Sequence, residues 1–149
     1  MKVFALSADS ELASYTTVTT LPVQWGDMDA FGHVNNVVYF RWFESARIDL
    51  LELLSQDVTM KGSGLGPILV SAKCDYRRQL HFPDTVHVGS KIGKVGRTSA
   101  EIHHAVYSQQ QDVIVAEGIS VMVVFDYDAH RPVRIPEDLR KKMQLDESS

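Results

Sequence analysis

The sequence has little cysteine, no long apolar run and no surplus of positive charge, and each absence excludes a class of protein. Cys74 is the only cysteine, so no disulfide can form within the chain, as is typical of proteins from a reducing compartment. No stretch reaches the roughly 18 consecutive apolar residues of a membrane-spanning helix. Fifteen lysines and arginines against nineteen acidic residues disfavour a nucleic-acid or anionic-membrane partner. These features predict a cytoplasmic protein that binds neither nucleic acid nor membrane.

The length and composition predict a single domain over residues 1–149. Hydrophobic residues make up 44% and charged residues 23%, which is ordinary for a globular domain of this size. The weak patterning at the two ends predicts a loose N-terminal arm over residues 1–14 and a loose C-terminal tail over residues 140–149.

One long helix is predicted near the start of the chain. The segment from Tyr15 to Trp25 is rich in threonine, valine and aromatics and is interpreted as a strand, with Pro22 at an edge or near its end. From Val37 to Leu54 there is no glycine or proline, and apolar residues recur at helical spacing. Asn35 or Asn36 is a suitable N-cap. The predicted helix is about 27 Å long and apolar enough to be largely covered.

Beyond residue 67 the apolar period changes from helical to two, which predicts about four further strands. The expected breaks are short enough for antiparallel hairpins; they are Phe82-Pro83-Asp84, Val95-Gly96-Arg97 and Gln109 to Asp112. Lys61 to Pro67 is interpreted as a connector, and Ile135 to Leu139 as the start of a short closing helix. Since no helix is available for parallel crossovers, the fold class is α+β, with a curved antiparallel sheet of five to six strands around one long central helix.

The residues with the clearest chemical potential lie just before the predicted helix. Asp27, Asp29, His33 and two asparagines fall within ten residues. A helix N-terminus offers unpaired N–H groups that stabilise a carbonyl oxygen as it becomes negative. A nearby carboxylate supplies a nucleophile or a base, so the segment is a candidate site for acyl transfer. Aspartate, glycine and asparagine are also ordinary turn residues, which is the competing interpretation.

The same segment resembles the opening motif of a known family. Asp27-Met28-Asp29, Gly32-His33-Val34-Asn35-Asn36, then Tyr39, Glu44 and Arg47 closely resemble hotdog-fold acyl-CoA thioesterases, in the branch of hydroxybenzoyl-CoA and long-chain acyl-CoA thioesterases. The resemblance implies a hotdog fold and the hydrolysis of an acyl-CoA to a free acid and CoA, without a metal or redox cofactor. It also implies a homodimer or homotetramer, because hotdog relatives join their sheets and place their active sites at that junction.

The resemblance assigns roles residue by residue. The catalytic aspartate of the family matches Asp29, which attacks the thioester carbonyl or activates water. The oxyanion donor matches the backbone N–H near Asn36. The turn at Arg97, Thr98 and Ser99 matches a place where relatives hold the CoA phosphates.

The neighbouring side chains have simpler alternatives. His33 is interpreted either as a group that hydrogen-bonds the substrate or orients water, or as a packing residue. Tyr39 lines the helix face, or else an acyl pocket. Asp27 is interpreted as a turn or cap residue, and Glu44 with Arg47 as an i,i+3 pair on the helix.

Other functions remain alternatives at this point. Asp27, Asp29 and His33 do not make a metal site by themselves, because the remaining histidines show no tight ligand spacing. A non-catalytic acyl-CoA-binding module would not need Asp29. A hotdog dehydratase would be expected to carry a different Asp/His set on the helix, and none follows Asn36. Cys74 lies in a strand pattern and is expected to be packed rather than reactive.

Overall fold

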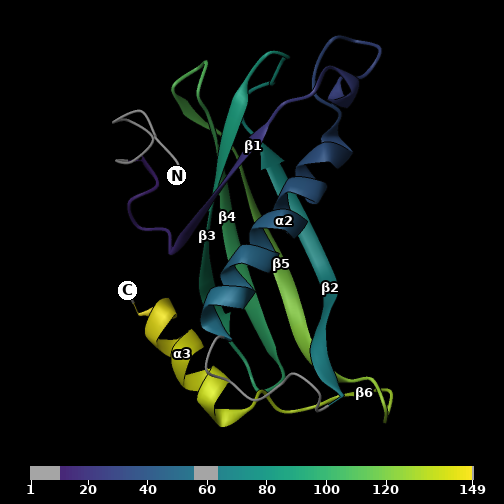
Figure 1. The fold of residues 1–149 in the computed structure, drawn as a ribbon, viewed down its shortest axis with the longest axis vertical. Helices are drawn as coiled ribbons and strands as arrows, with labels where there is room; N and C mark the ends of the chain where they lie inside the picture. The colour runs from purple at the N-terminus through teal and green to yellow at the C-terminus, as the bar shows by residue number, and fades with distance from the viewer. Residues whose placement is uncertain (1–10, 56–63, 149) are drawn as a thin grey trace.

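The computed structural model describes residues 11–55 and 64–148, and this part of the chain forms one antiparallel sheet with two α-helices (Figure 1). The strands are β1 (Thr17–Pro22), β2 (Leu65–Tyr76), β3 (Thr85–Val95), β4 (Ser99–Ser108), β5 (Val113–Asp126) and the short β6 (Arg131–Pro132). Their order is β1-β3-β4-β5-β2, with β6 beside β5, so β1 and β2 form the two edges. The predicted antiparallel sheet is confirmed.

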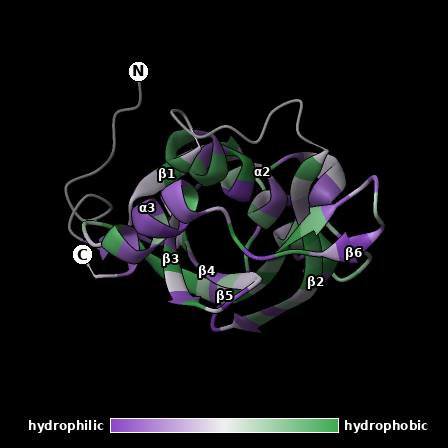
Figure 2. Cartoon of the chain, turned by 90° about the horizontal axis from the view of Figure 1, so that it is seen from below, coloured by the Kyte–Doolittle hydropathy of each residue, from purple (hydrophilic) through white to green (hydrophobic). Residues whose placement is uncertain are grey.

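Helix α2 (Asn36–Leu54) lies over the concave side of the curved sheet (Figure 2). It starts at Asn35, whose side chain accepts a hydrogen bond from the Val37 N–H, as an N-cap should. The helix packs close to β5, because Phe43 lies against Gly118. A Cβ atom added at Gly118 would come within 2.5 Å of the Phe43 ring. Glycine at this position therefore sets how near the helix approaches the sheet.

The first strand is shorter than the sequence predicts. β1 ends at Pro22, and residues Trp25–Asp27 form the 3-10 helix η1 instead of continuing the strand. The break follows from Pro22, which has no N–H to donate to a neighbouring strand.

The predicted hairpin at Phe82-Pro83-Asp84 is wrong. β2 pairs with β5 and β3 pairs with β1 and β4, so the segment between β2 and β3 crosses the end of the sheet. The hairpins at the other two breaks are confirmed by the β3–β4 and β4–β5 pairings.

The predicted connector at Lys61 to Pro67 is also corrected in part. Residues 61–63 lie outside the described residues, but β2 already begins at Leu65 and includes Pro67. An edge strand tolerates proline, because one side of it has no neighbour that needs an N–H.

Both chain ends differ from the loose segments that were expected. Of the predicted arm, residues 1–10 lie outside the described residues, but Leu12 is only 3% exposed and packs with Ala105 and Tyr107. Of the predicted tail, residues 140–147 belong to helix α3 (Glu137–Glu147). Asp146 near its end is buried and accepts hydrogen bonds from Thr16 and from the Ile92 N–H. These contacts hold the helix on the sheet.

A polar chain crosses the core between helix and sheet. Arg47 is only 7% exposed and donates to the Ser120 hydroxyl at 3.0 Å, and the charge of Glu44, its predicted i,i+3 partner, also acts on it. His104 bridges Ser120 and Ser90 at 3.0 and 2.8 Å and stacks on Phe43. Burial, together with the charge of Arg47, lowers the pKa of His104 to about 3. The imidazole is therefore neutral at physiological pH.

Candidate active site

The loop before α2 is a tight turn with Asp29 at its base. Met28 and Val34 form an antiparallel bridge, and the Asp29 N–H donates to the His33 carbonyl at 2.8 Å. Gly32 has a φ of 82°, a left-handed conformation that glycine adopts without strain. The sequence thus places the glycine where the turn needs it, and the turn fixes the backbone of Asp29.

The Asp29 side chain is exposed and is held by its own loop. Its Oδ1 accepts a hydrogen bond from the Phe31 N–H at 2.8 Å and a longer one from the His33 N–H at 3.5 Å. Such a turn is a common use of aspartate. Within the described residues Oδ2 has no hydrogen-bond partner, so one carboxylate oxygen is available for chemistry.

Asp27 has a structural role, as its interpretation as a cap residue requires. It is buried, and its Oδ2 accepts a hydrogen bond from the Gln24 N–H at 2.8 Å in the cap of η1. Its Oδ1 lies 3.4 Å from the Arg41 guanidinium. Of the two aspartates in the motif, only Asp29 faces a pocket with the helix N-terminus.

The first residue of α2 presents a backbone donor. The Val37 N–H is occupied by the Asn35 cap, and the Val38 N–H donates to the Asn35 carbonyl at 2.9 Å. The Asn36 N–H has no acceptor among the residues that the structure describes. It lies at the positive end of the helix dipole, which is a suitable place for an oxyanion.

These groups share a pocket of about 790 Å³. Asp29, His33, Asn36 and Tyr39 all line it, so the structure brings together four of the residues singled out in the sequence. His33 is half-buried and packs edge-to-face on His81, whose ring nitrogen lies 3.0 Å from the Gly32 carbonyl. His33 therefore both packs against His81 and lines the pocket.

Two tyrosines form the inner wall of the pocket. Tyr39 is buried and meets Tyr76 edge-to-face at 4.9 Å between ring centres, and the Tyr76 hydroxyl donates to the Asn36 carbonyl. Burial raises the pKa of Tyr39, and it raises the pKa of Tyr76 to about 12. Both phenols are therefore protonated at neutral pH and cannot act as bases.

The remaining predicted site residues lie elsewhere. Thr98 lines a different cavity, together with Leu51 and Ser55 from the C-terminal end of α2. Fifteen helical residues separate Asn36 from Leu51, which is about 22 Å along the axis. Arg97 and Thr98 lie in the β3–β4 turn, and Ser99 is the first residue of β4. Arg140 holds this turn by donating to the Gly96 and Arg97 carbonyls at 2.8 Å. Within one chain they do not meet Asp29.

The end of β2 and the segment after it supply pocket residues that the motif did not indicate. These are Tyr76, Arg77, Arg78, Gln79 and His81, with Gln111 from the β4–β5 turn. Arg77 forms an ion pair with Glu117 at 2.7 Å. The adjacent arginines are a visible signal in the sequence, but nothing local shows that they lie opposite Asp29.

A carboxylate and an unpaired N–H in one pocket suit attack on a carbonyl carbon.

Among residues 11–55 and 64–148 no group of three or more histidine, cysteine, aspartate or glutamate side chains could hold a metal ion. No helix in the same residues is long and apolar enough to cross a membrane.

Comparisons with known proteins agree with this fold. The family model of the thioesterase-like superfamily matches residues 23–143. The long-chain acyl-CoA thioesterase FadM of Escherichia coli (strain K12) is 23% identical over 126 residues, covering 85% of this chain and 96% of FadM.

Two solved structures show the same architecture. One, of a thioesterase-superfamily protein from Jannaschia sp. CCS1, has 27% identity and a TM-score of 0.84 over 96% of this chain and 90% of its own. The other, of a predicted thioesterase from Bacillus stearothermophilus, has 29% identity and a TM-score of 0.75 over 87% and 94%.

The fold and these comparisons together define a hotdog-fold thioester hydrolase. The chain belongs to the thioesterase-like superfamily.

Proposed function

We propose that this chain hydrolyses an acyl-CoA to a free carboxylic acid and CoA, with Asp29 as the acting carboxylate. The observation that carries the proposal is that Asp29 and Asn36 line the same pocket, and that the Asn36 N–H has no acceptor among the described residues. The similarity to FadM supports acyl-CoA as the class of substrate.

The chemistry follows from these two groups. Either the Asp29 carboxylate adds to the thioester carbon, or it takes a proton from a water that adds. In both routes an electron pair moves onto the carbonyl oxygen, where the Asn36 N–H and the helix dipole stabilise it. The CoA thiolate then leaves, and because a thiol has a pKa near 8.5 it needs little protonation. In the first route, water hydrolyses the resulting anhydride and restores Asp29.

The other pocket residues have supporting roles in this proposal. His33 hydrogen-bonds the substrate or orients the water, and Tyr39 forms the wall beside the acyl carbonyl. The reaction uses no metal or redox cofactor, because a carboxylate, a water and an amide donor are sufficient for thioester hydrolysis.

We also propose that the enzyme is a homodimer or a dimer of dimers, acting in the cytoplasm. Strand β2 is a sheet edge, and Leu69 and Val70 in its middle are 42% and 57% exposed. Such an edge favours pairing with another strand. Contacts from Arg97, Thr98 and Ser99 to the CoA phosphates would then come from the second subunit, since they lie far from Asp29 in their own chain.

The proposal is tested by thiol release from a panel of acyl-CoAs, with wild type and Asp29→Asn side by side. We expect the wild type to release CoA and the variant to be strongly impaired. Binding without hydrolysis by the wild type would indicate an acyl-CoA-binding module, and water loss from a hydroxyacyl-CoA would indicate a dehydratase. Either result would overturn the proposal.

A further inference from the structure

The segment that follows β2 lies against the loop that carries Asp29. Two backbone contacts join them: the Val34 N–H donates to the Leu80 carbonyl at 2.9 Å, and the Phe82 N–H donates to the Met28 sulfur at 3.4 Å. Met28 directly precedes Asp29, and Val34 ends the turn that Asp29 begins. The segment therefore holds the Asp29 turn at both of its ends.

Within this segment, His81 binds a peptide group that faces the Asp29 carboxylate. Its Nδ1 lies 3.0 Å from the Gly32 carbonyl oxygen, and because a carbonyl oxygen can only accept, Nδ1 carries a proton in this bond. The N–H of the same planar peptide group belongs to His33 and donates to the Asp29 Oδ1 at 3.5 Å. One peptide group thus links the His81 ring to the Asp29 carboxylate. The edge-to-face contact between His81 and His33 further orients the ring.

Tyr76, the last residue of β2, makes a corresponding contact at the start of α2. Its hydroxyl donates to the Asn36 carbonyl at 3.0 Å. The N–H of that peptide group belongs to Val37 and donates to the side chain of the N-cap residue Asn35 at 3.2 Å. Tyr76 therefore orients the capped first turn of the helix, in which the Asn36 N–H has no acceptor among the described residues.

We propose that Tyr76 and His81 are positioning residues, which set where the Asp29 carboxylate lies relative to the Asn36 N–H. The inference rests on the proposed function, in which these two groups act on the same thioester carbonyl. Attack and charge stabilisation must be aligned on that carbonyl, and a displacement of about 1 Å can lower the rate about a hundredfold. Because Tyr76 and His81 lie close together in the chain, they tie both groups to one common frame.

The first experiment compares two replacements of His81. Phenylalanine keeps a ring beside His33 but has no donor for Gly32. The amide nitrogen of asparagine is as many bonds from the main chain as Nδ1, so it can donate to the same carbonyl. We expect His81→Phe to lower kcat by about 10–100-fold with little change in KM, and His81→Asn to recover most of that loss. Equal losses in both variants, or no loss in His81→Phe, would overturn the role of His81.

Tyr76→Phe tests the other contact. It removes the hydroxyl but keeps the ring against Tyr39, and it should lower kcat by about 10–100-fold. The Cys74 thiol also hydrogen-bonds to the Tyr76 hydroxyl, so Cys74→Ala is the matched control and should keep the wild-type kcat. Wild-type kcat in Tyr76→Phe, or the same loss in Cys74→Ala, would overturn the role of Tyr76.

The second experiment tests through which group each side chain acts. His81→Phe is measured in an Asp29→Asn background and Tyr76→Phe in an Asn36→Pro background. Each should change kcat by less than about twofold there, because the group that it positions is already absent. Losses as large as in the wild-type background would show that the side chains act independently of these groups, and would overturn the inference.

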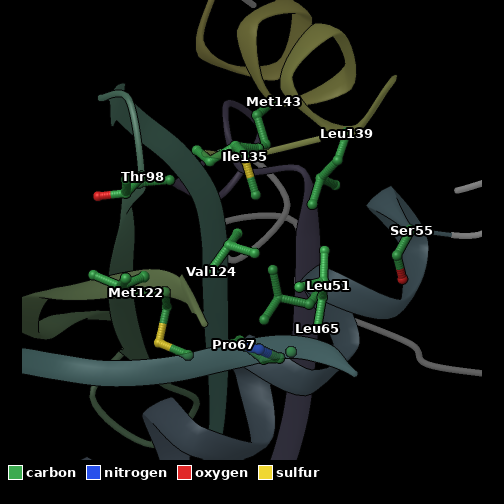
Figure 3. A pocket seen from close by; sticks show the side chains of 13 residues that line it. Leu51, Ser55, Leu65, Pro67, Thr98, Met122, Val124, Ile135, Leu139 and Met143 are labelled. Atoms are coloured by element: carbon green, nitrogen blue, oxygen red, sulfur yellow. The ribbon is translucent and has the colours of Figure 1, made fainter. Parts of the chain in front are cut away.

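A variant at the other end of α2 separates lost stability from lost positioning. The apolar cavity there is lined in part by Leu139 of α3, and none of the described residues that line it belongs to the Asp29 pocket (Figure 3). Leu139→Ala leaves a void in this packing, so it should lower the Tm but keep the wild-type kcat well below that temperature. If Leu139→Ala loses as much kcat as His81→Phe, the losses report stability and the inference fails.

Hydrogen exchange tests the His81 contact without any substrate. The Asp29 and Gly32 N–H groups are bonded inside the turn, to the His33 and Asp29 carbonyls at 2.8 and 3.1 Å. Both should exchange faster in His81→Phe than in wild type or His81→Asn.

Unchanged exchange in His81→Phe would overturn the inference while leaving the proposed function intact. A wild type inert on every acyl-CoA, or an Asp29→Asn variant as active as wild type, would instead overturn the proposed function and this inference with it, whatever the exchange rates.

Discussion

The Asp29 carboxylate accepts a hydrogen bond from the backbone N–H of Phe31 at 2.8 Å. This bond fixes one oxygen of the carboxylate in the turn before α2, while the other oxygen has no partner among the described residues. An asparagine at this position would preserve the turn, because its carbonyl oxygen accepts the same bond. Asp29→Asn therefore removes the charge and leaves the loop in place.

The proposed oxyanion donor, the Asn36 N–H, can be removed without disturbing the helix. Asn36 is the first residue of α2, where proline is well tolerated because this N–H has no helical acceptor. Asn35 has φ −63° and ψ 137°, a conformation compatible with a following proline. We expect Asn36→Pro to lower kcat by about 10²–10³-fold, as for loss of one oxyanion donor.

Asn36→Ala is the control for that measurement, because it changes the side chain and keeps the N–H. It should retain most of the activity, with helix content by circular dichroism unchanged in both variants. Equal activity of the proline and alanine variants would show that the Asn36 N–H does not bind the oxyanion.

The buried imidazole of His104 predicts a pH-dependent stability. Its pKa is about 3 in the folded protein and near 6.5 in the unfolded chain, so the unfolded chain binds the extra proton between these values. The contribution of the neutral imidazole to the free energy of unfolding is thus fully present above about pH 6.5 and decreases as the pH falls below that value. From pH 7 to pH 5 this residue alone should lower the free energy of unfolding by about 2 kcal/mol.

Urea denaturation of wild type and His104→Gln at both pH values measures this effect. The glutamine can still bond to Ser90 or Ser120 but does not titrate. We expect the variant to lose about 2 kcal/mol less than wild type over this range. The same loss in both proteins would assign the acid sensitivity to other groups.

Cys74 should be unreactive in the folded protein. Burial, with a smaller contribution from the charge of Asp75, raises the pKa of its thiol to about 11, although a hydrogen bond with Tyr76 acts in the opposite direction. Alkylation by iodoacetamide at pH 8 should be more than about a hundredfold slower than for a free cysteine, because the thiolate is the reacting form. Mass spectrometry of native and denatured samples measures the two rates, and similar rates would contradict the packed assignment.

Local patterns predicted α2 and the antiparallel strands, because helical and two-residue periods report which faces are buried. Which strands pair with one another depends on contacts between residues far apart in the sequence, and local periodicity does not report these contacts. The sequence placed β2 and β3 in a hairpin, whereas β2 pairs with β5. A register shift between Leu69 and Ser71 also leaves Val70 exposed, although simple alternation groups it with Ile68 and Ala72.

Small and polar residues in the core were equally hard to interpret. Gly118 and Ser120 on β5 face α2, where they accommodate Phe43 and bond to Arg47. Spacing alone suggested an i,i+3 pair of Arg47 with Glu44, and it gave no sign of the bond to Ser120. The direction of a long side chain depends on a tertiary partner that the helix pattern does not contain.

The candidate residues that share a pocket were predicted together where they are local in sequence. Asp29, His33, Asn36 and Tyr39 lie within eleven residues, and the structure places all four in one pocket. Arg78 and His81 complete that pocket from a segment some forty residues further on, which only the crossing connection brings near. Arg97 lies at the other end of α2, so its proposed role depends on a second subunit.

The central claim is that the Asp29 carboxylate performs the chemistry. Its most direct test is the kcat/KM of Asp29→Asn on the best acyl-CoA, beside Asp27→Asn as the matched control two residues away. The account predicts a loss of about 10²–10⁴-fold for Asp29→Asn and near wild-type activity for a folded Asp27→Asn. Hydrolysis by Asp29→Asn at the wild-type rate would contradict it.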